Sequence, residues 1–357
     1  MVSSREPLSP HRTKMFPAVF KKRLHDHLPA HPEPLQLLSI PRELASLVCI
    51  GFDGAEPTPF LEEALAAGVS SVILFSRNVG TPEETARTCE RIRESAGRPI
   101  LITIDQEGGE SRRLVDGFTA VPPMRHLAAG GPDLVEEAAR TTARELRSVG
   151  IGLDFAPVVD VDTNPDNPVI GDRSFSSDAG IVSMLGATWV RAMQEEGVAA
   201  CAKHFPGHGD TSEDSHHELP RLGHDLERLR RVELPPFRTA VEAGVAAIMS
   251  AHVLFEAVDP LVPATLSPNV LQGILREEIG FQGVVVSDDL EMEAIMGRMS
   301  SGEAATRAIE AGVDLLLCCH REDRQREVLE TLGNSLDPGR AAGAIERVGG
   351  LISTYAC

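Results

Sequence analysis

Short apolar segments alternate with longer amphipathic segments along the chain from residue 44 onward. Each apolar segment is a continuous hydrophobic run, which is typical of parallel strands buried on both faces. The amphipathic segments have the apolar spacing of helices. We therefore predict strands at residues 44–52, 71–75, 100–104, 152–159, 198–202, 246–250, 284–286 and 313–318. The predicted helices are at residues 59–67, 82–95, 132–148, 181–196, 226–242, 268–278, 302–310 and 324–332.

Eight strand–helix units in succession predict an α/β fold, namely a single (β/α)8 barrel of the TIM type. An open, doubly wound sheet is the alternative for this order of elements. Nothing in the composition marks a linker between two domains, so we assign residues 37–357 to one catalytic barrel. Residues 1–36 are rich in Pro and His and lack periodicity, and we predict a poorly ordered, flexible N-terminal extension there.

The chain is acidic, with a formal net charge of −19 over 357 residues. This balance lacks the basic footprint of a nucleic-acid-binding protein. No apolar run reaches the roughly 18 residues of a membrane span, and the N-terminus lacks the apolar core of a signal peptide. The six cysteines include no CxxC pair, as expected for buried thiols in a reducing compartment. We expect a cytoplasmic monomer or weak dimer, without nucleic-acid or membrane partners.

A polar loop follows the fifth predicted strand, at residues 203–220, with the sequence KHFPGHGDTSEDSHHELP. Loops that carry many titratable groups on a rigid scaffold are frequent sites of function. Polar residues also follow other predicted strands, namely Asp105, Asp160, His252 and Asp288. Because the carboxyl ends of barrel strands meet on one face, the sequence predicts an active site there and therefore an enzyme.

Asp288 stands at the end of the predicted strand Gly-Val-Val-Val-Ser. A carboxylate fixed at that place suits a nucleophile or a group that stabilises positive charge. The alternative is that Asp288 or Asp289 caps the next helix. Two residues apart on the polar loop, Asp214 and His216 point the same way if the segment is extended. A carboxylate beside an imidazole favours the charged ring and orients it, so His216 is a candidate general acid.

The histidines of the loop, His204, His208, His216 and His217, also raise the alternative of a metal site. A zinc hydrolase of this fold needs two or three histidines that converge with a carboxylate. The early strands carry no His-x-His pair, so we predict neither a metal nor another cofactor.

Taken together, these motifs resemble glycoside hydrolase family 3, in its single-domain NagZ-type branch of β-N-acetylglucosaminidases. The resemblance covers roughly residues 44–320, in the order and spacing of the family. Its most specific part is KHFPGHG at residues 203–209 followed by Asp-Ser-His at 214–216. The other matching motifs are DQEGG at 105–109, NPVIGDRSF at 167–175 and SDDLEM at 287–292.

The resemblance implies that Asp288 is a nucleophile that forms a covalent glycosyl-enzyme, and that His216, paired with Asp214, is the acid/base. It also implies that the sugar and its N-acetyl group are held by Asp105, Arg113, Arg173, Lys203 and His204. Carboxylates accept hydrogen bonds from sugar hydroxyls, whereas Arg and Lys donate them. Two alternatives are structural: Arg173 pairs with Asp172 or Asp105, or Lys203 holds its own loop.

One departure from the family pattern lies after Gly109, where Glu110 and Ser111 replace the usual Arg-Val. A negative charge then stands beside the sugar-binding loop. The contact to the sugar falls to Arg112 or Arg113, and the motif spacing favours Arg113.

The implied activity is that of a retaining exo-β-N-acetylglucosaminidase, a β-N-acetylhexosaminidase. The implied substrates are small glycosides, above all muropeptides from peptidoglycan recycling during cell-wall turnover. A β-N-acetylglucosaminide phosphorylase on the same site is the first alternative, because a His acid/base admits phosphate. A β-glucosidase-like hydrolase and a non-catalytic sugar-binding barrel are the others.

Overall fold

The structure, a computed structural model, describes residues 40–215 and 219–357. Eight parallel strands close into a barrel in the order β1-β10-β9-β7-β5-β4-β3-β2. The closed sheet confirms the predicted barrel and excludes the open-sheet alternative. The barrel strands are β1 (Val48–Ile50), β2 (Ser71–Leu74), β3 (Leu101–Ile104), β4 (Leu153–Asp154), β5 (Ala199–Phe205), β7 (Ala247–Ser250), β9 (Val284–Asp289) and β10 (Leu315–Cys318).

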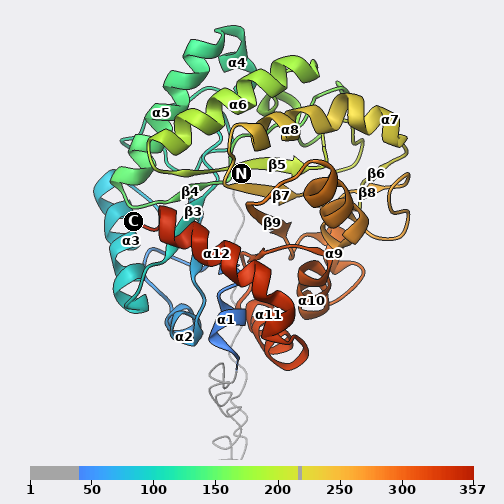
Figure 1. The fold of residues 1–357 in the computed structure, drawn as a ribbon. Coiled ribbons are helices and arrows are strands. Elements are labelled where there is room, and N and C mark those ends of the chain that lie inside the picture. Colours follow the sequence, from blue (N-terminus) through green and yellow to red (C-terminus); the bar gives the residue numbers. More distant parts are fainter. Residues whose placement is uncertain (1–39, 216–218) are drawn as a thin grey trace, which may run out of the picture. The chain divides into compact units, whose positions relative to one another are not determined.

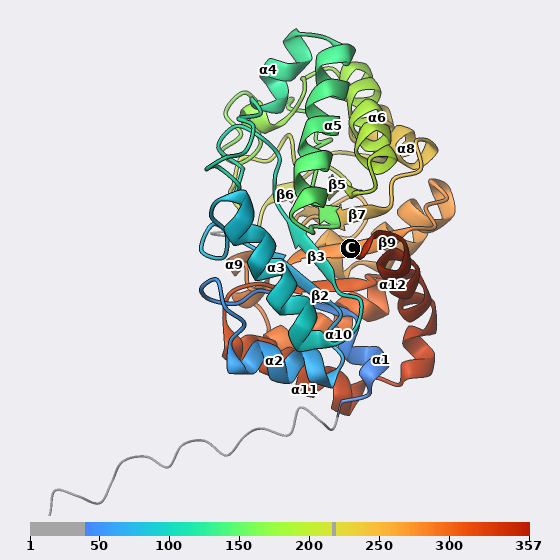
Figure 2. The ribbon, with the colours of Figure 1, turned by 90° about the vertical axis from the view of Figure 1, so that its left-hand side faces the viewer.

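Helices surround the strands on the outside of the barrel (Figures 1 and 2). Their apolar faces pack on the strands, and the buried residues of both layers form one continuous hydrophobic core. The α-helices are α1 (Arg42–Ala45), α2 (Pro59–Ala67), α3 (Pro82–Ala96), α4 (Met124–Ala129), α5 (Pro132–Ser148), α6 (Ala179–Glu195), α7 (Leu226–Arg228), α8 (Leu234–Glu242), α9 (Glu293–Met296), α10 (Ser301–Ala311), α11 (Glu322–Ser335) and α12 (Ala342–Tyr355).

All eight predicted strands are present, but the fourth, predicted at residues 152–159, is a strand only over Leu153–Asp154, and the first differs at its start. Residues 42–45 form the short helix α1, and β1 begins only at Val48. Pro41 is the N-cap of this helix, and its carbonyl accepts hydrogen bonds from the main-chain N–H groups of Leu44 (2.9 Å) and Ala45 (3.1 Å). Leu44 is buried in the core as part of this helix. Its apolar character therefore reflects helix packing and not a place in a strand.

Two predicted helices contain wide, π-helical turns. The helix predicted at residues 226–242 has a π-helical segment, Leu229–Glu233, between α7 and α8. Pro235 and Pro236 follow this segment and lack the N–H groups that would close ordinary α-helical bonds to it. The helix predicted at 268–278 is π-helical over Asn269–Glu278. A small parallel sheet of β6 (Arg221–Leu222) and β8 (Leu254–Phe255) is too short to leave a sequence pattern.

A buried charge cluster closes the amino-terminal end of the barrel. Asp314, just before β10, accepts hydrogen bonds from Arg276 (2.6 Å) and from Arg347 on α12 (2.8 Å). It also accepts one from the main-chain N–H of Val285 in β9 (2.8 Å). Paired charges therefore join α12 to the strands at the amino-terminal end of the barrel. This end has a structural role, and the carboxyl ends of the strands lie opposite it.

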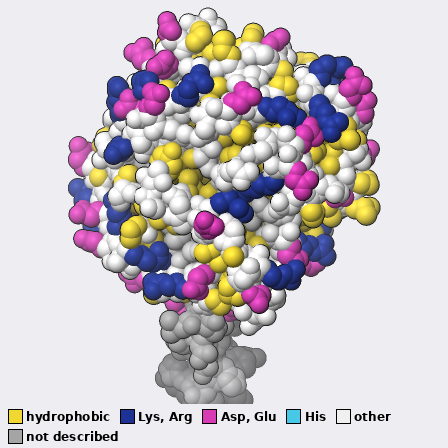
Figure 3. Space-filling model, viewed as in Figure 1, with side chains coloured by type: hydrophobic (Ala, Val, Ile, Leu, Met, Phe, Trp, Pro, Cys, Tyr) yellow, Lys and Arg dark blue, Asp and Glu magenta, His cyan; other side chains and the backbone are white. Residues whose placement is uncertain are grey.

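The surface of the barrel mixes both signs of charge. Figure 3 shows Lys and Arg side chains interspersed with Asp and Glu over the face that carries α12. Within residues 40–215 and 219–357, no helix is long and apolar enough to cross a bilayer. The predicted extension at residues 1–36 lies outside the described residues and stays a prediction.

Candidate active site

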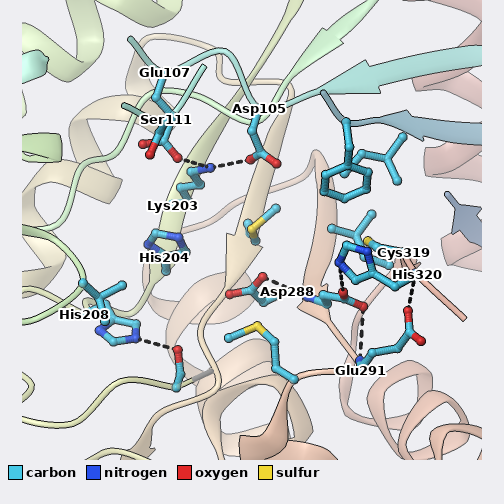
Figure 4. Close-up of a pocket in the computed structure, with 18 of the residues that line it drawn as sticks. Asp105, Glu107, Ser111, Lys203, His204, His208, Asp288, Glu291, Cys319 and His320 are labelled. Carbon is cyan, nitrogen blue, oxygen red and sulfur yellow. Dashed lines mark hydrogen bonds and ion pairs between the residues drawn. The ribbon is translucent and has the colours of Figure 1, made fainter. Parts of the chain in front are cut away.

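A cavity of about 460 Å³ lies at the carboxyl ends of the barrel strands, and Figure 4 shows its lining. Polar side chains enter it from β3, β5, β9, β10 and the loops that follow. Six of the residues predicted from the sequence line this cavity: Asp105, Arg113, Arg173, Lys203, His204 and Asp288. Barrel closure therefore brings together groups that are far apart in the chain.

Asp288 lies in the last part of β9, between Ser287, which is in register with Ser250 of β7, and Asp289, which is in register with Leu317 of β10. Its Oδ1 accepts a hydrogen bond from the main-chain N–H of Asp289 at 2.8 Å. Burial alone would raise the pKa of Asp288, but the nearby imidazoles of His252 and His204 lower it below its usual value. The carboxylate is therefore ionised at neutral pH, as nucleophilic attack requires.

The next helix is not capped by either aspartate of β9. Its residue before the first turn is Met292, with extended backbone and no side-chain cap. The helix-cap alternative for Asp288 and Asp289 is therefore wrong.

Glu107 is the hub of a buried ion-pair network on the wall formed by β3 and β5. Arg173 donates to both of its carboxylate oxygens at 2.8 Å. Lys203 Nζ lies 2.6 Å from Glu107 Oε1 and 2.8 Å from Asp105 Oδ1. Burial opposes the ionisation of Glu107, but the two cations hold its pKa well below the usual range. The network fixes Lys203 and Arg173 in the cavity wall.

The partner of Arg173 differs from the two considered in the sequence. Asp172 and Asp105 were the candidates, whereas the structure pairs Arg173 with Glu107 in a bidentate contact. Bidentate pairing sets the plane of the guanidinium as well as its position. Lys203 is likewise held from two sides, by Asp105 and Glu107, and does not hold its own loop.

The side chain of Gln106 holds the main chain at Arg113. Its Oε1 accepts from the main-chain N–H groups of Arg113 (2.8 Å) and Leu114 (3.0 Å). The side chain of Arg113 reaches Asp105, whose Oδ2 lies 3.7 Å from Arg113 Nη2. Arg113 lines the cavity and Arg112 does not, in agreement with the motif spacing.

Asp160 orients the two histidines of the motif at residues 203–209. Its carboxylate accepts from Nδ1 of His204 at 2.7 Å and from the main-chain N–H of His208 at 2.7 Å. Because a carboxylate can only accept, His204 carries a proton on Nδ1 and presents Nε2 away from Asp160. The imidazole of His204 holds the pKa of the fully buried Asp160 below its usual value, against the effect of burial.

His208 is buried and does not contact Asp160 through its ring. Its Nδ1 lies 2.8 Å from Thr211 Oγ1 and its Nε2 lies 3.1 Å from Ser215 Oγ. Burial lowers the pKa of His208 to about 4, so the ring is neutral and serves as a hydrogen-bonding strut. The strut holds Ser215, which lines the cavity.

Of the predicted acid/base pair, Asp214 is among the described residues and His216 is not. Asp214 lines a neighbouring hollow of about 390 Å³ that shares Ser111, Val169 and Arg173 with the cavity. His216 lies outside the described residues, so the pairing of Asp214 with His216 stays a prediction.

Several residues of the site were not assigned from the sequence. Glu107 stands two residues after Asp105, and Asp160 directly follows the fourth apolar run, so both carried a positional signal. Phe75 and His320 also line the cavity. They follow β2 and β10, and their rings pack against each other, tilted by 41°, with centroids 4.9 Å apart. Over residues 40–215 and 219–357, no three His, Cys, Asp or Glu side chains converge as metal ligands would.

Comparison with known proteins identifies the family. The model of the glycosyl hydrolase family 3 N-terminal domain matches residues 42–348. A protein of Thiobacillus denitrificans named β-hexosaminidase is 44% identical over 271 residues, which cover 74% of this chain and 75% of that protein. A β-hexosaminidase of Stenotrophomonas maltophilia is 38% identical over 312 residues, covering 84% and 91%.

Similar solved structures indicate the same family. A family 3 β-N-acetylglucosaminidase from Paenibacillus sp. is 45% identical with a TM-score of 0.86, over 88% of this chain and 62% of that one. NagZ from Neisseria gonorrhoeae in complex with N-trifluoroacetyl-D-glucosamine is 31% identical with a TM-score of 0.73, over 86% and 94%. The chain therefore belongs to glycosyl hydrolase family 3, in its NagZ-type branch, and is a glycoside hydrolase of the β-hexosaminidase kind.

Proposed function

We propose that the protein is a retaining exo-β-N-acetylglucosaminidase in which Asp288 is the nucleophile. The observation that carries this proposal is the position of Asp288, ionised and held on a barrel strand in a cavity walled by hydrogen-bonding groups (Figure 4). A sugar in this cavity meets donors and acceptors on one wall and the carboxylate at the end of β9. Two-step glycoside hydrolysis needs this combination.

In the first step, an oxygen of Asp288 attacks the anomeric carbon and forms a bond to it while the bond to the leaving oxygen breaks. His216, oriented by Asp214, gives its proton to that leaving oxygen. In the second step, His216 takes a proton from water, whose oxygen displaces Asp288 from the sugar. The acid of the first step is thus the base of the second, and the configuration at carbon 1 is retained.

Five side chains hold the sugar in this proposal: Asp105, Arg113, Arg173, Lys203 and His204. The four cationic and imidazole groups supply N–H donors, and Asp105 accepts from hydroxyls. The ion pairs with Glu107 and Asp160 keep Arg173, Lys203 and His204 in place before a sugar arrives. Preorganised donors of this kind cost little rearrangement on binding.

The substrates that we propose are small β-N-acetylglucosaminides, above all muropeptides released during peptidoglycan recycling. The N-acylated glucosamine in the related Neisseria structure supports an N-acetylated sugar in this cavity. We also propose a cytoplasmic location, because the cysteines of the described chain are unpaired and Cys49, Cys89, Cys201, Cys318 and Cys319 are buried, as is usual in reducing compartments.

The decisive experiment measures hydrolysis of 4-nitrophenyl β-N-acetylglucosaminide by wild type and by Asp288→Asn, with and without phosphate. We expect cleavage in plain buffer and a loss of at least about 10³-fold in Asp288→Asn. The matching β-glucoside, which lacks the acetamido group, tests the sugar preference. Proton NMR of the first product tests retention of configuration.

Each result has a distinct meaning. A requirement for phosphate, with a sugar 1-phosphate as product, identifies the phosphorylase. Equal cleavage of the β-glucoside points to a β-glucosidase-like hydrolase. Full activity of folded Asp288→Asn overturns the nucleophile assignment.

A further inference from the structure

His320 lines the cavity on the side of Asp288 that is away from Lys203 and His204 (Figure 4). It follows β10 and its ring is about half exposed. Two contacts fix the ring: it packs against Phe75 with centroids 4.9 Å apart and the ring planes tilted by 41°, and its Nδ1 lies 3.3 Å from Arg77 Nη1. The ring therefore has a defined orientation in the cavity wall.

Arg77 is itself tied to the main chain of two other barrel segments. Its Nε donates to the carbonyl of Phe52 at 2.8 Å, and its Nη2 donates to the carbonyl of Cys319 at 2.9 Å. Phe52 follows β1 and Cys319 follows β10, so the guanidinium joins three neighbouring strand ends. It is a rigid support for the imidazole that it contacts.

The contact with Arg77 determines where the imidazole carries its proton. A guanidinium only donates, so Nδ1 of His320 accepts and the proton of the neutral ring is on Nε2. That Nε2 lies 3.4 Å from Oδ2 of Asp289. The distance is long for a hydrogen bond, but the N–H is a donor and the carboxyl oxygen can accept. Burial and the positive charge of Arg77 lower the pKa of His320, which keeps the ring neutral near pH 7.

Asp289 connects His320 to the nucleophile. Its side chain is held at Oδ1 by the N–H of Glu291 (3.1 Å), and its carbonyl accepts from Nε2 of His252 (3.0 Å). Its own N–H donates to Oδ1 of Asp288, which is the one hydrogen bond that Asp288 makes among the residues that the structure describes. The main-chain N–H of Asp289 therefore orients the carboxylate of Asp288.

We propose that His320 is a positioning residue for the nucleophile: supported by Arg77, its Nε2–H holds the side chain of Asp289, whose main-chain N–H holds Asp288. This inference rests on the proposed role of Asp288. Burial raises the pKa of Asp289 to about 8, so near neutral pH the held side chain places no second full charge beside Asp288. His320 then orients Asp288 through Asp289, and the neutral Asp289 side chain does not repel the negative charge of Asp288.

The test compares His320→Leu with His320→Gln on 4-nitrophenyl β-N-acetylglucosaminide. Leu fills the space but has no donor, whereas the Gln amide keeps an N–H that can reach Asp289. We expect His320→Leu to lower kcat by about tenfold with KM changed less than about twofold, because displacing a reacting group by a fraction of an ångström costs rate rather than binding. His320→Gln is expected to recover kcat to within about threefold of wild type.

Controls separate this inference from the proposed function. His126→Leu changes an exposed histidine of α4 and is expected to leave kcat unchanged. Far-UV circular dichroism and the melting temperature establish that each variant is folded. A folded His320→Leu with wild-type kcat, or with a raised KM at constant kcat, overturns the positioning role while an inactive Asp288→Asn leaves the proposed function standing. Full activity of Asp288→Asn overturns both.

Discussion

His208 Nε2 lies 3.1 Å from Ser215 Oγ, and this contact links the end of β5 to the residue that precedes His216. The carbonyl of Ser215 also accepts from Ala294 in α9, just beyond the nucleophile motif. Ser215 is therefore held from two sides, and the backbone beside the proposed acid/base is held with it.

Replacement of Ser215 by Ala is expected to slow natural substrates more than activated ones. If His216 protonates the leaving oxygen, its misplacement matters most when that oxygen is a poor leaving group. We expect kcat/KM to fall about tenfold or more on N-acetylglucosaminyl disaccharides and less than about threefold on 4-nitrophenyl glycosides. The measurement is kcat/KM over a series of aglycones of rising pKa. Equal losses across the series would argue against this role of Ser215.

Glu107→Gln is expected to damage both stability and sugar binding. The change removes the charge that pairs with Arg173 and Lys203 and leaves two cations in the wall without full compensation. Breaking a buried pair typically costs about 3 kcal/mol or more. Chemical denaturation measures the free energy of unfolding, and inhibition by N-acetylglucosamine measures binding. Glu110→Gln, three residues away and exposed, is the matched control and is expected to change neither quantity appreciably.

Asp154 should make the stability of the protein fall as the pH rises. Burial raises the pKa of this carboxyl from 3.8 to about 8 in the folded state. The folded chain therefore keeps a proton that the unfolded chain releases, and the stability present below about pH 4 is lost between that pH and about pH 8. The limiting slope for one such group is about 1.4 kcal/mol per pH unit.

The measurement for Asp154 is the free energy of unfolding at several pH values in wild type and in Asp154→Asn. Subtraction of the two curves isolates this carboxyl from the other titrating groups, and the wild type is expected to lose stability relative to the variant from pH 5 to pH 8. Asp166→Asn, at an exposed position, is the control and should give parallel curves. If the curve of unfolding free energy against pH for Asp154→Asn also ran parallel to that of the wild type, the raised pKa of Asp154 would be contradicted.

Asp314→Ala is expected to lower stability without altering catalysis in the folded enzyme. The substitution removes the partner of Arg276 and Arg347 at the amino-terminal end of the barrel. A loss of about 3–5 kcal/mol is typical when one member of a buried ion pair is removed. We expect kcat and KM per folded molecule to stay within about twofold of wild type, because the cavity is at the other end. A loss of kcat in fully folded protein would refute this separation of roles.

The order of strands and helices was predictable because hydrophobic periodicity is a local property. Continuous apolar runs marked all eight barrel strands, and apolar spacing marked most of the surrounding helices. The short α1 was missed because Leu44 is as apolar as the strand that follows it, and apolarity alone does not distinguish a buried turn of helix from a strand.

Candidate site residues were predictable for a related reason. Polar residues that follow apolar runs stand at strand ends, and barrel closure gathers those ends on one face. Asp105, Lys203 and Asp288 were found in this way and line one cavity. The motif at residues 203–209 then gave the family, which the comparisons confirm.

The pairing of the charges was decided only by the tertiary structure. Arg173 and Glu107 are 66 positions apart, and Lys203 and Asp105 are 98 apart. Which carboxylate faces which cation depends on strand register and on the curvature of the closed sheet, neither of which leaves a periodic signal. The link from His320 to Asp289 has the same origin. The sequence by itself determined the barrel and the end at which its chemistry lies, and the closure of the barrel determined which side chains hold one another there.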